Sequence, residues 1–213
     1  MNLCRHAFCF VCVWVYLAAS VPGQATTRNV PGDYPTIQDA IDAAEDGDTV
    51  LLADGVYSEE FSLHAKSLIV KSAGGPENCI IEGPGCQRMR FQGIRQVRGI
   101  FEGITVNNMH CSQTIGLDGH LSIWGSAMDF KNCVFSNLSY TSSFIAAGII
   151  YAFNSNLVFD NCTFVDNELD KFGVGTLGIF LFEQCSLTML NCSFINNTDR
   201  VGLTFTDCYV TID

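Results

Sequence analysis

Short runs of alternating apolar and polar residues fill most of this chain, and many of the runs stop at an asparagine. Leu157 and Phe159 lie on one face of such a run, Asn161 interrupts it, and Cys162 and Phe164 resume the apolar positions. Period-two alternation is typical of a half-buried β-strand. Asparagine, like glycine, tolerates the left-handed backbone of a sharp bend. The pattern therefore predicts short strands joined by fixed corners.

The same unit is repeated along the chain at a nearly constant interval. Asn-Cys-x-Phe begins at Asn132, Asn161 and Asn191, which are 29 and 30 residues apart, and a more diverged copy at residues 101–108 has Gly103 at its corner. A period of this length, built from strands, predicts coils that stack so that each strand pairs in parallel with its counterpart about 4.8 Å away. The predicted fold class is all-β, a right-handed parallel β-helix.

Stacked coils place like residues above like, so Phe135, Phe164 and Phe194 are expected to form an interior column. The asparagine amides of the repeat are expected to bond between coils, and its cysteines to stack inside as small apolar groups. This structural ladder consists of Asn132, Asn161, Asn191, Cys133, Cys162 and Cys192.

Eight cysteines follow residue 25, and an even number in a secreted chain indicates disulfides. In the ladder, parallel side-chain directions favour free thiols over bridges, although neighbouring coils are close enough for a bond. The better disulfide candidates are Cys79 with Cys86 and Cys185 with Cys208.

The segment before the first coils has helical rather than strand periodicity. Ile37, Ala40, Ile41 and Ala44 follow the i, i+3, i+4, i+7 spacing, and Thr36 provides a helix start. We expect an amphipathic helix that covers the open N-terminal end of the solenoid.

The last residues of the sequence, 201–213, restart a coil without a capping helix or a polar terminal unit. An uncovered end exposes strand edges that pair with other strands. We expect the β-helix to be incomplete here, with its open edge pairing with missing coils or with another chain.

Residues 1–25 have the layout of a secretory signal peptide, with a basic start, an apolar run over residues 7–19 and small residues after it. The apolar run is shorter than the roughly 20 residues of a membrane span. We therefore expect a signal peptide at 1–25, a β-helix domain at 26–213, and a secreted or cell-surface protein.

The chain is acidic, with 11 Lys and Arg against 22 Asp and Glu and a net charge of −11. This charge disfavours nucleic acid as a partner, because phosphate binding relies on basic side chains. After residue 25 no Cys-x-x-Cys pair is present to indicate zinc. The acidic loop with Asp166, Glu168 and Asp170 is a calcium candidate, although solvation alone explains it. We expect no cofactor.

The segment "YPTIQDAIDAAEDGDTVLLADGVYSE", followed by "CIIEG", resembles the N-terminal part of the pectin-lyase-like superfamily of right-handed β-helix proteins. That superfamily includes pectate lyases, polygalacturonases, pectinesterases and many non-catalytic surface proteins. Gly55, Tyr57 and Glu59 match a pectinesterase block that non-catalytic relatives share, while the paired aspartates and the glutamine of the esterase site are not found. The Phe164-x-x-Asn167 spacing is also similar to repeats of chlamydial polymorphic outer-membrane proteins. The resemblance is specific for fold, and the fold hosts many functions.

Four arginines lie close together in this acidic sequence: Arg88, Arg90, Arg95 and Arg98. Arginine binds carboxylate and sulfate groups through two parallel hydrogen bonds, so the cluster is a candidate contact for an anion or polysaccharide. The alternative, which we favour, is a solvated face paired with local acids.

Glycoside hydrolysis needs paired carboxylates, which on stacked coils would be acids at outward positions of adjacent strands. Lys131 and Asp160 fall in one column and Asp129 in another, and neither column has acids in adjacent coils. The sequence therefore offers no catalytic residue.

Four Asn-x-Ser/Thr sequons are present, at Asn137, Asn161, Asn191 and Asn196. Asn161 and Asn191 belong to the ladder and are predicted to be unmodified. Asn137 and Asn196, in the following turn, are the glycosylation candidates.

Our leading hypothesis from the sequence is a secreted or cell-surface β-helix scaffold, non-catalytic, for adhesion or carbohydrate contact. The alternative is a polysaccharide-active enzyme, of pectate lyase, polygalacturonase or pectinesterase type, whose active-site coils are missing from this chain.

Overall fold

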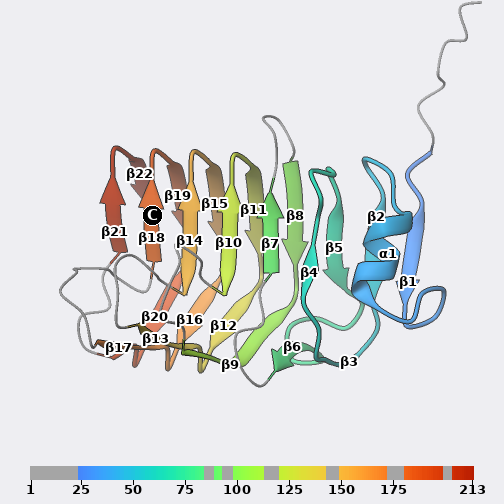
Figure 1. The fold of residues 1–213 in the computed structure, drawn as a ribbon, viewed down its shortest axis with the longest axis horizontal. Coiled ribbons are helices and arrows are strands. Elements are labelled where there is room, and N and C mark those ends of the chain that lie inside the picture. The colour runs from blue at the N-terminus through green and yellow to red at the C-terminus, as the bar shows by residue number, and fades with distance from the viewer. Residues whose placement is uncertain are drawn as a thin grey trace, which may run out of the picture.

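The computed structural model describes residues 24–83, 89–92, 98–112, 120–142, 149–171, 180–198 and 203–213. These residues contain 22 strands and one helix. The strands stack along a single axis, from β1 at the N-terminal end to β21 and β22 at the C-terminal end (Figure 1). Each pair of neighbouring strands is parallel. The predicted parallel β-helix is confirmed.

The strands form sheets A, B, C and D along the stack, and sheets B and D are joined through β9. Sheet A contains β1 (Thr27–Val30), β2 (Thr49–Leu52), β5 (Ile69–Ser72), β8 (Arg98–Glu102), β11 (Ala127–Lys131), β15 (Asn156–Asp160), β19 (Ser186–Leu190) and β22 (Tyr209–Ile212). Sheet B contains β3 (Gly55–Tyr57), β6 (Cys79–Gly83), β9 (Thr105–Ser112), β12 (Val134–Ser136), β16 (Thr163–Val165) and β20 (Ser193–Ile195). Sheet C contains β4 (Phe61–Ser62), β7 (Met89–Gln92), β10 (Leu121–Trp124), β14 (Ile150–Phe153), β18 (Phe180–Glu183) and β21 (Leu203–Thr206). Sheet D contains the end of β9, β13 (Ser139–Ser142) and β17 (Glu168–Lys171).

The chain turns from sheet A to sheet B at corners whose first residue has a left-handed backbone. Asn132, Asn161 and Asn191 have φ angles of 50°, 53° and 52°, and Gly103 has 66°. This conformation costs an ordinary residue about 1–2 kcal/mol, and asparagine and glycine adopt it most readily. The requirement for a left-handed residue explains why asparagine is repeated at this position.

The residue after each corner asparagine is a cysteine whose thiol closes the corner from inside. Cys162 Sγ donates to the carbonyl oxygen of Asp160 at 3.5 Å and to that of Phe130, one coil earlier, at 3.4 Å. Ser155 uses its hydroxyl in the same way, donating to the carbonyl of Phe153 at 2.8 Å. Asn-Cys thus forms the corner: the asparagine adopts the left-handed backbone, and the cysteine thiol that follows points inward and donates to backbone carbonyl groups.

The structure contradicts the predicted disulfide between Cys185 and Cys208. Cys185 and Cys208 are free thiols, and Cys208 Sγ accepts a hydrogen bond from the Cys185 backbone N–H at 3.3 Å. Both sulfurs point inward from the corners of adjacent coils, and each donates to carbonyl groups of its own corner and of the preceding coil. The geometry that keeps the ladder cysteines unpaired therefore applies to this pair as well.

Aromatic columns fill the interior of the stack. The rings of Phe135 and Phe164 are stacked with centroids 5.0 Å apart, and those of Phe164 and Phe194 follow at 4.9 Å. Phe130 and Phe159 stack at 4.8 Å in a second column. These separations equal the distance between strands, so the rings stack because the coils are in register.

A second asparagine position, which the sequence analysis did not interpret as structural, lies inside the solenoid. Asn167 is fully buried, and its Nδ2 donates to the Phe135 carbonyl at 2.9 Å. Its Oδ1 accepts from the Leu138 backbone N–H at 3.0 Å, and its Nδ2 also reaches Asn197 Oδ1 at 2.9 Å. A buried amide with these partners satisfies backbone groups at a corner, which offsets the cost of its burial.

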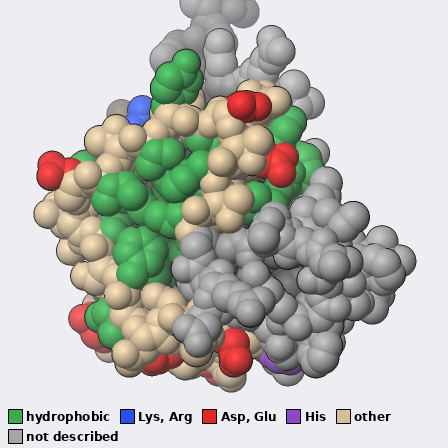
Figure 2. All heavy atoms as spheres, turned by 90° about the vertical axis from the view of Figure 1, so that its left-hand side faces the viewer, with side chains coloured by type: hydrophobic (Ala, Val, Ile, Leu, Met, Phe, Trp, Pro, Cys, Tyr) green, Lys and Arg blue, Asp and Glu red, His purple; other side chains and the backbone are tan. Residues whose placement is uncertain are grey.

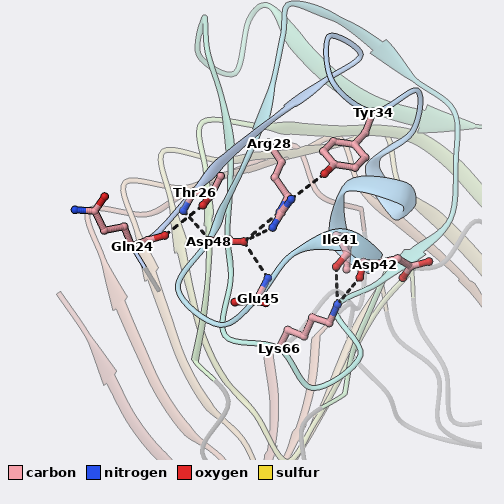
Figure 3. A network of polar contacts seen from close by, with 9 residues as sticks. All are labelled: Gln24, Thr26, Arg28, Tyr34, Ile41, Asp42, Glu45, Asp48 and Lys66. Atoms are coloured by element: carbon pink, nitrogen blue, oxygen red, sulfur yellow. Dashed lines mark hydrogen bonds and ion pairs between the residues drawn. The ribbon is translucent and has the colours of Figure 1, made fainter. Parts of the chain in front are cut away.

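Helix α1 (Ile37–Ala43) is present where the sequence spacing predicts it, with Ile37, Ala40 and Ile41 buried. It packs against β1, β2 and β4 at the N-terminal end of the stack (Figure 1). Lys66 Nζ donates to the carbonyl oxygens of Ile41 and Asp42 at 2.8 and 2.9 Å, at the C-terminal end of the helix (Figure 3). That the helix serves as a cover for the end of the solenoid stays a prediction.

A buried carboxylate joins the loop after α1 to β1. Asp48 accepts hydrogen bonds from the backbone N–H groups of Thr26 at 2.7 Å and Glu45 at 2.9 Å, and from Arg28 at 2.8 Å (Figure 3). The bond from Glu45, followed by that from Thr26, holds the pKa of Asp48 below its usual value. The role of Asp48 is therefore structural.

The phenylalanine column predicts a gradient of stability effects along the stack. Phe164→Ala should lower the free energy of unfolding by about 3–5 kcal/mol, the usual cost for a fully buried phenylalanine. Phe194→Ala, in the same column but 44% exposed, should cost clearly less. Urea unfolding followed by circular dichroism measures both, and equal losses would contradict the burial described for the column.

A buried thiol in sheet B predicts how stability depends on pH. Burial, with a smaller contribution from the charge of Asp54, raises the pKa of Cys79 to about 12 from an ordinary value of 9.0. Between these values the unfolded chain ionises the thiol and the folded chain does not, so stability falls as pH rises above 9. Cys79→Ala should reduce this fall, as measured by urea midpoints at several pH values. If the urea midpoints of the wild type and of Cys79→Ala change with pH in the same way, the prediction is wrong.

Candidate functional site: the charged outer face of sheet A

The outer face of sheet A carries charged side chains of alternating sign. The strand register places Lys71 beside Glu102, Glu102 beside Lys131, and Lys131 beside Asp160. Unlike charges side by side on neighbouring strands stabilise a sheet by about 0.2–1 kcal/mol per pair. Together with a neighbouring ion pair they form what we call the charged face, which consists of Lys71, Arg98, Glu102, Asp129, Lys131 and Asp160.

That ion pair joins β8 to β11. Arg98 Nη2 lies 2.6 Å from Asp129 Oδ2, and the hydrogen bond to this carboxylate raises the pKa of Arg98. The Asp129 side chain is only 9% exposed, whereas that of Arg98 is 66% exposed. The guanidinium therefore covers a nearly buried carboxylate and keeps most of its own surface in solvent.

The predicted arginine cluster is divided between sheets. Arg98 begins β8 in sheet A, while Arg90 lies on β7 in sheet C, with a side chain outside the described part. Arg88 and Arg95 lie outside the described residues. Arg98 fits the interpretation that we favoured, because a local acid binds it. Anion binding by the four arginines stays a prediction.

A second relation among the acids of this face was not predicted, because it joins residues of different columns. Asp129 pairs with Val158, two positions before Asp160, so the two aspartates are diagonal neighbours on adjacent strands. Strand spacing and rise place their Cα atoms about 8 Å apart. Diagonal neighbours on a sheet are within reach of long side chains, which is the rule that would have identified the pair.

The Gly-x-Tyr-x-Glu block connects the first coil to the helix. Glu59 accepts hydrogen bonds from the backbone N–H groups of Ile37 at 3.0 Å and Gln38 at 3.3 Å, at the start of α1. Tyr57 Oη lies 2.8 Å from the carbonyl oxygen of Ala53. A carboxylate at a helix N-terminus is stabilising because the first N–H groups have no partner within the helix. The block therefore has a structural role here.

Comparison with known protein families agrees with this geometry. The family model described as "Right handed beta helix region" matches residues 77–213, more than half of the chain. The chain belongs to the right-handed β-helix family. The predicted right-handed β-helix is thereby confirmed.

Among solved structures, this β-helix protein is similar to a pectin methylesterase mutant crystallised in complex with a hexasaccharide. The sequences are 10% identical, the match covers 88% of this chain and 89% of that chain, and the TM-score is 0.41. A search of curated protein sequences gave no match.

The sequons of the β-helix protein lie at exposed left-handed corners. Asn161 Nδ2 donates to Asn132 Oδ1 at 2.7 Å, and Asn137 Nδ2 donates to Asn107 Oδ1 at 3.0 Å in the same manner. The amide of Asn137 is thus also engaged between coils, which the sequence analysis expected only of the ladder. Glycosylation at Asn137 and Asn196 stays a prediction.

The structure also bears on the predicted metal, disulfide and membrane features. Among the described residues, no group of three His, Cys, Asp or Glu side chains is placed to hold a metal ion. Asp166 is an exposed corner residue with a φ of 53°, and Glu168 is exposed beside it. Cys79 is a buried free thiol, so its predicted bridge to Cys86, which lies outside the described residues, is wrong. No helix in the described ranges has the length and hydrophobicity to cross a membrane.

The role of Glu59 gives a prediction with a neighbouring control. Glu59→Ala leaves two helix N–H groups without their acceptor and should lower the free energy of unfolding by about 1 kcal/mol. Glu60→Ala removes the same charge from an exposed position and should change stability by less. Thermal unfolding of both variants measures the difference. If the two lose equal stability, Glu59 does not hold the helix.

Proposed function

We propose that this chain is a secreted or cell-surface β-helix scaffold, without catalytic machinery, that contacts carbohydrate through the charged face. Residues 1–25 serve as its secretory signal and residues 26–213 as its β-helix domain. The alternating charges carry the proposal, because sugar hydroxyls donate hydrogen bonds to carboxylates and accept them from lysine and arginine. The register of sheet A presents both kinds of group at the spacing of the coils.

The non-catalytic part of the proposal is supported by what several acids already do in the fold. Glu59 holds the start of α1, Asp48 joins β1 to the loop after the helix, and Asp129 binds Arg98. A catalytic acid or base needs a free carboxyl group near the reacting bond. These three groups are engaged with partners inside the molecule.

A second candidate function is favoured by the diagonal aspartates. Inverting glycoside hydrolases use two carboxyl groups about 6.5–9.5 Å apart, and the Cα atoms of Asp129 and Asp160 lie about 8 Å apart by strand geometry. Such an enzyme, of the pectate lyase, polygalacturonase or pectinesterase type, would need Asp129 to be released from Arg98. This requirement is why we prefer the scaffold.

Binding measurements on immobilised polysaccharides test the proposal. Asp160→Asn should weaken binding about 3- to 10-fold, because it replaces the charged acceptor that ends the charged face on β15. Asp166→Asn makes the same chemical change at an exposed corner between sheets B and D, where asparagine tolerates the left-handed backbone, and should bind like the wild type.

Three results would contradict the scaffold proposal. In the first, the wild-type chain binds no polysaccharide. In the second, Asp160→Asn and Asp166→Asn lose affinity equally. In the third, the wild-type chain cleaves or de-esterifies pectic polymers and the double variant Asp129→Ala, Asp160→Ala does not. That last result would establish the second candidate instead.

A further inference from the structure

Two aromatic side chains lie on the outer face of sheet C, apart from the core. Trp124 on β10 and Phe153 on β14 are directly opposite each other in the register of these neighbouring strands (Figure 1). They pack against Tyr151 and Leu181 in a cluster that is separate from the one filling the interior. Tyr151 and Leu181 are buried, whereas Trp124 and Phe153 are only partly covered. The partly covered pair therefore has ring surface that a ligand can contact.

The rings of this outer pair meet at an angle, unlike the stacked rings of the core. The centroids of Trp124 and Phe153 are 5.7 Å apart, and the planes are inclined by 47°. In the core, Phe135 and Phe164 stack at 8°. Two inclined rings form a corner in which one compact group contacts both. A cation in this corner lies within about 6 Å of both centroids, which is the range of cation–π attraction.

A carboxylate follows this pair in the next coil. Glu183 on β18 is directly opposite Phe153, and its side chain points outward because Phe182, the residue before it, is buried in the core. Glu183 is partly buried. Among the residues that the structure describes, its carboxylate has no hydrogen bond or ion pair. Because covering a carboxylate without a partner is costly, Glu183 is suited to pair with a positive group from outside the chain.

The indole N–H of Trp124 also has no acceptor within the described ranges. A tryptophan N–H that is covered usually has a hydrogen-bond partner, so this group remains available to a ligand. We call these three side chains the outer aromatic site, which consists of Trp124, Phe153 and Glu183. They belong to successive strands and so span about 10 Å, or two strand spacings. The site combines two ring faces, one negative charge and one donor.

The electrostatic surroundings favour a positively charged ligand. Residues 132–213 include eight acidic and two basic residues, in a chain whose net charge is −11. Figure 2 shows acidic side chains, in red, around the C-terminal end of the stack, where β21 pairs with β18. A surface of one sign raises the local concentration of ions of opposite charge and disfavours ions of the same charge.

We propose that the outer aromatic site binds a free quaternary ammonium compound of the choline type. The trimethylammonium group lies in the corner between Trp124 and Phe153, where the electron-rich ring faces attract it, and Glu183 balances its charge. A hydroxyl oxygen of the same ligand accepts a hydrogen bond from the Trp124 N–H. A sugar ring fits less well, because the inclined rings offer it no continuous flat surface and it carries no charge to pair with Glu183.

The inference does not rest on the proposed function, since the outer aromatic site is on sheet C and the charged face is on sheet A. Choline binding without polysaccharide binding, or the reverse, separates the two.

The fluorescence of Trp124 reports binding at this site directly. The chain has two tryptophans, so Trp14→Phe in the full chain leaves Trp124 as the only one. We expect choline chloride to change its emission along a saturable curve, and isothermal titration calorimetry to give the same affinity. The neutral isostere of choline, in which carbon replaces the nitrogen, has the same shape without the charge and should bind at least about tenfold more weakly.

Substitutions separate the contribution of the rings from that of the charge. Phe153→Leu should weaken choline binding about 3- to 30-fold, whereas Phe153→Tyr, which keeps a ring, should bind like the wild type. Glu183→Gln should weaken it about 5- to 10-fold. Glu168→Gln on sheet D and Phe194→Leu on sheet B make the same changes at exposed positions and should have no effect. Circular dichroism of each variant verifies that the fold is retained.

Four results would overturn the inference. In the first, choline chloride does not bind at millimolar concentration. In the second, the neutral isostere binds as tightly as choline, which would make the contact simply apolar. In the third, Glu168→Gln and Phe194→Leu weaken binding as much as Glu183→Gln and Phe153→Leu. In the fourth, phosphatidylcholine vesicles displace bound choline, which would assign the cation to a lipid head group instead of a free compound.

Discussion

The register between successive coils is the constraint on which the whole structure depends. A slip of one residue would turn every inward side chain of a strand toward solvent. The corners prevent this slip: Asn161 adopts the left-handed backbone, its amide bonds to Asn132, and the thiol of Cys162 bonds to a carbonyl of the preceding coil. The stacked phenylalanines are buried because these polar contacts align the coils.

The fold was predictable because its corners recur in the sequence. The four positions of Asn-Cys-x-Phe specify the left-handed bend, the thiol that points inward and the phenylalanine ring of the core. The disulfide between Cys185 and Cys208 was wrongly predicted because an even cysteine count was given more weight than their corner positions. The interior role of Asn167 was missed because a buried amide departs from the apolar pattern, and only its backbone partners account for it.

The candidate site was harder to predict from the sequence, because the residues that contact one another in it belong to different columns of the stack. Asp129 was compared with its own column, whereas the structure sets it against Arg98 and diagonal to Asp160. The block containing Tyr57 and Glu59 matches enzymes in sequence and yet serves to hold the first coil and the helix together. Motifs that persist because they build the fold are weak indicators of chemistry. Function on this solenoid is better sought on its faces, where side chains are free to contact a partner.

The most direct test of the account is the set of nuclear Overhauser contacts between side chains one coil apart. Stacking in register predicts contacts from Asn132 to Asn161, with an amide hydrogen bond of 2.7 Å, and from Phe135 to Phe164, with rings 5.0 Å apart. The same spacing continues from Phe164 to Phe194. Contacts that join these residues to other partners, with none between successive Asn-Cys-x-Phe units, would contradict the stacked coils.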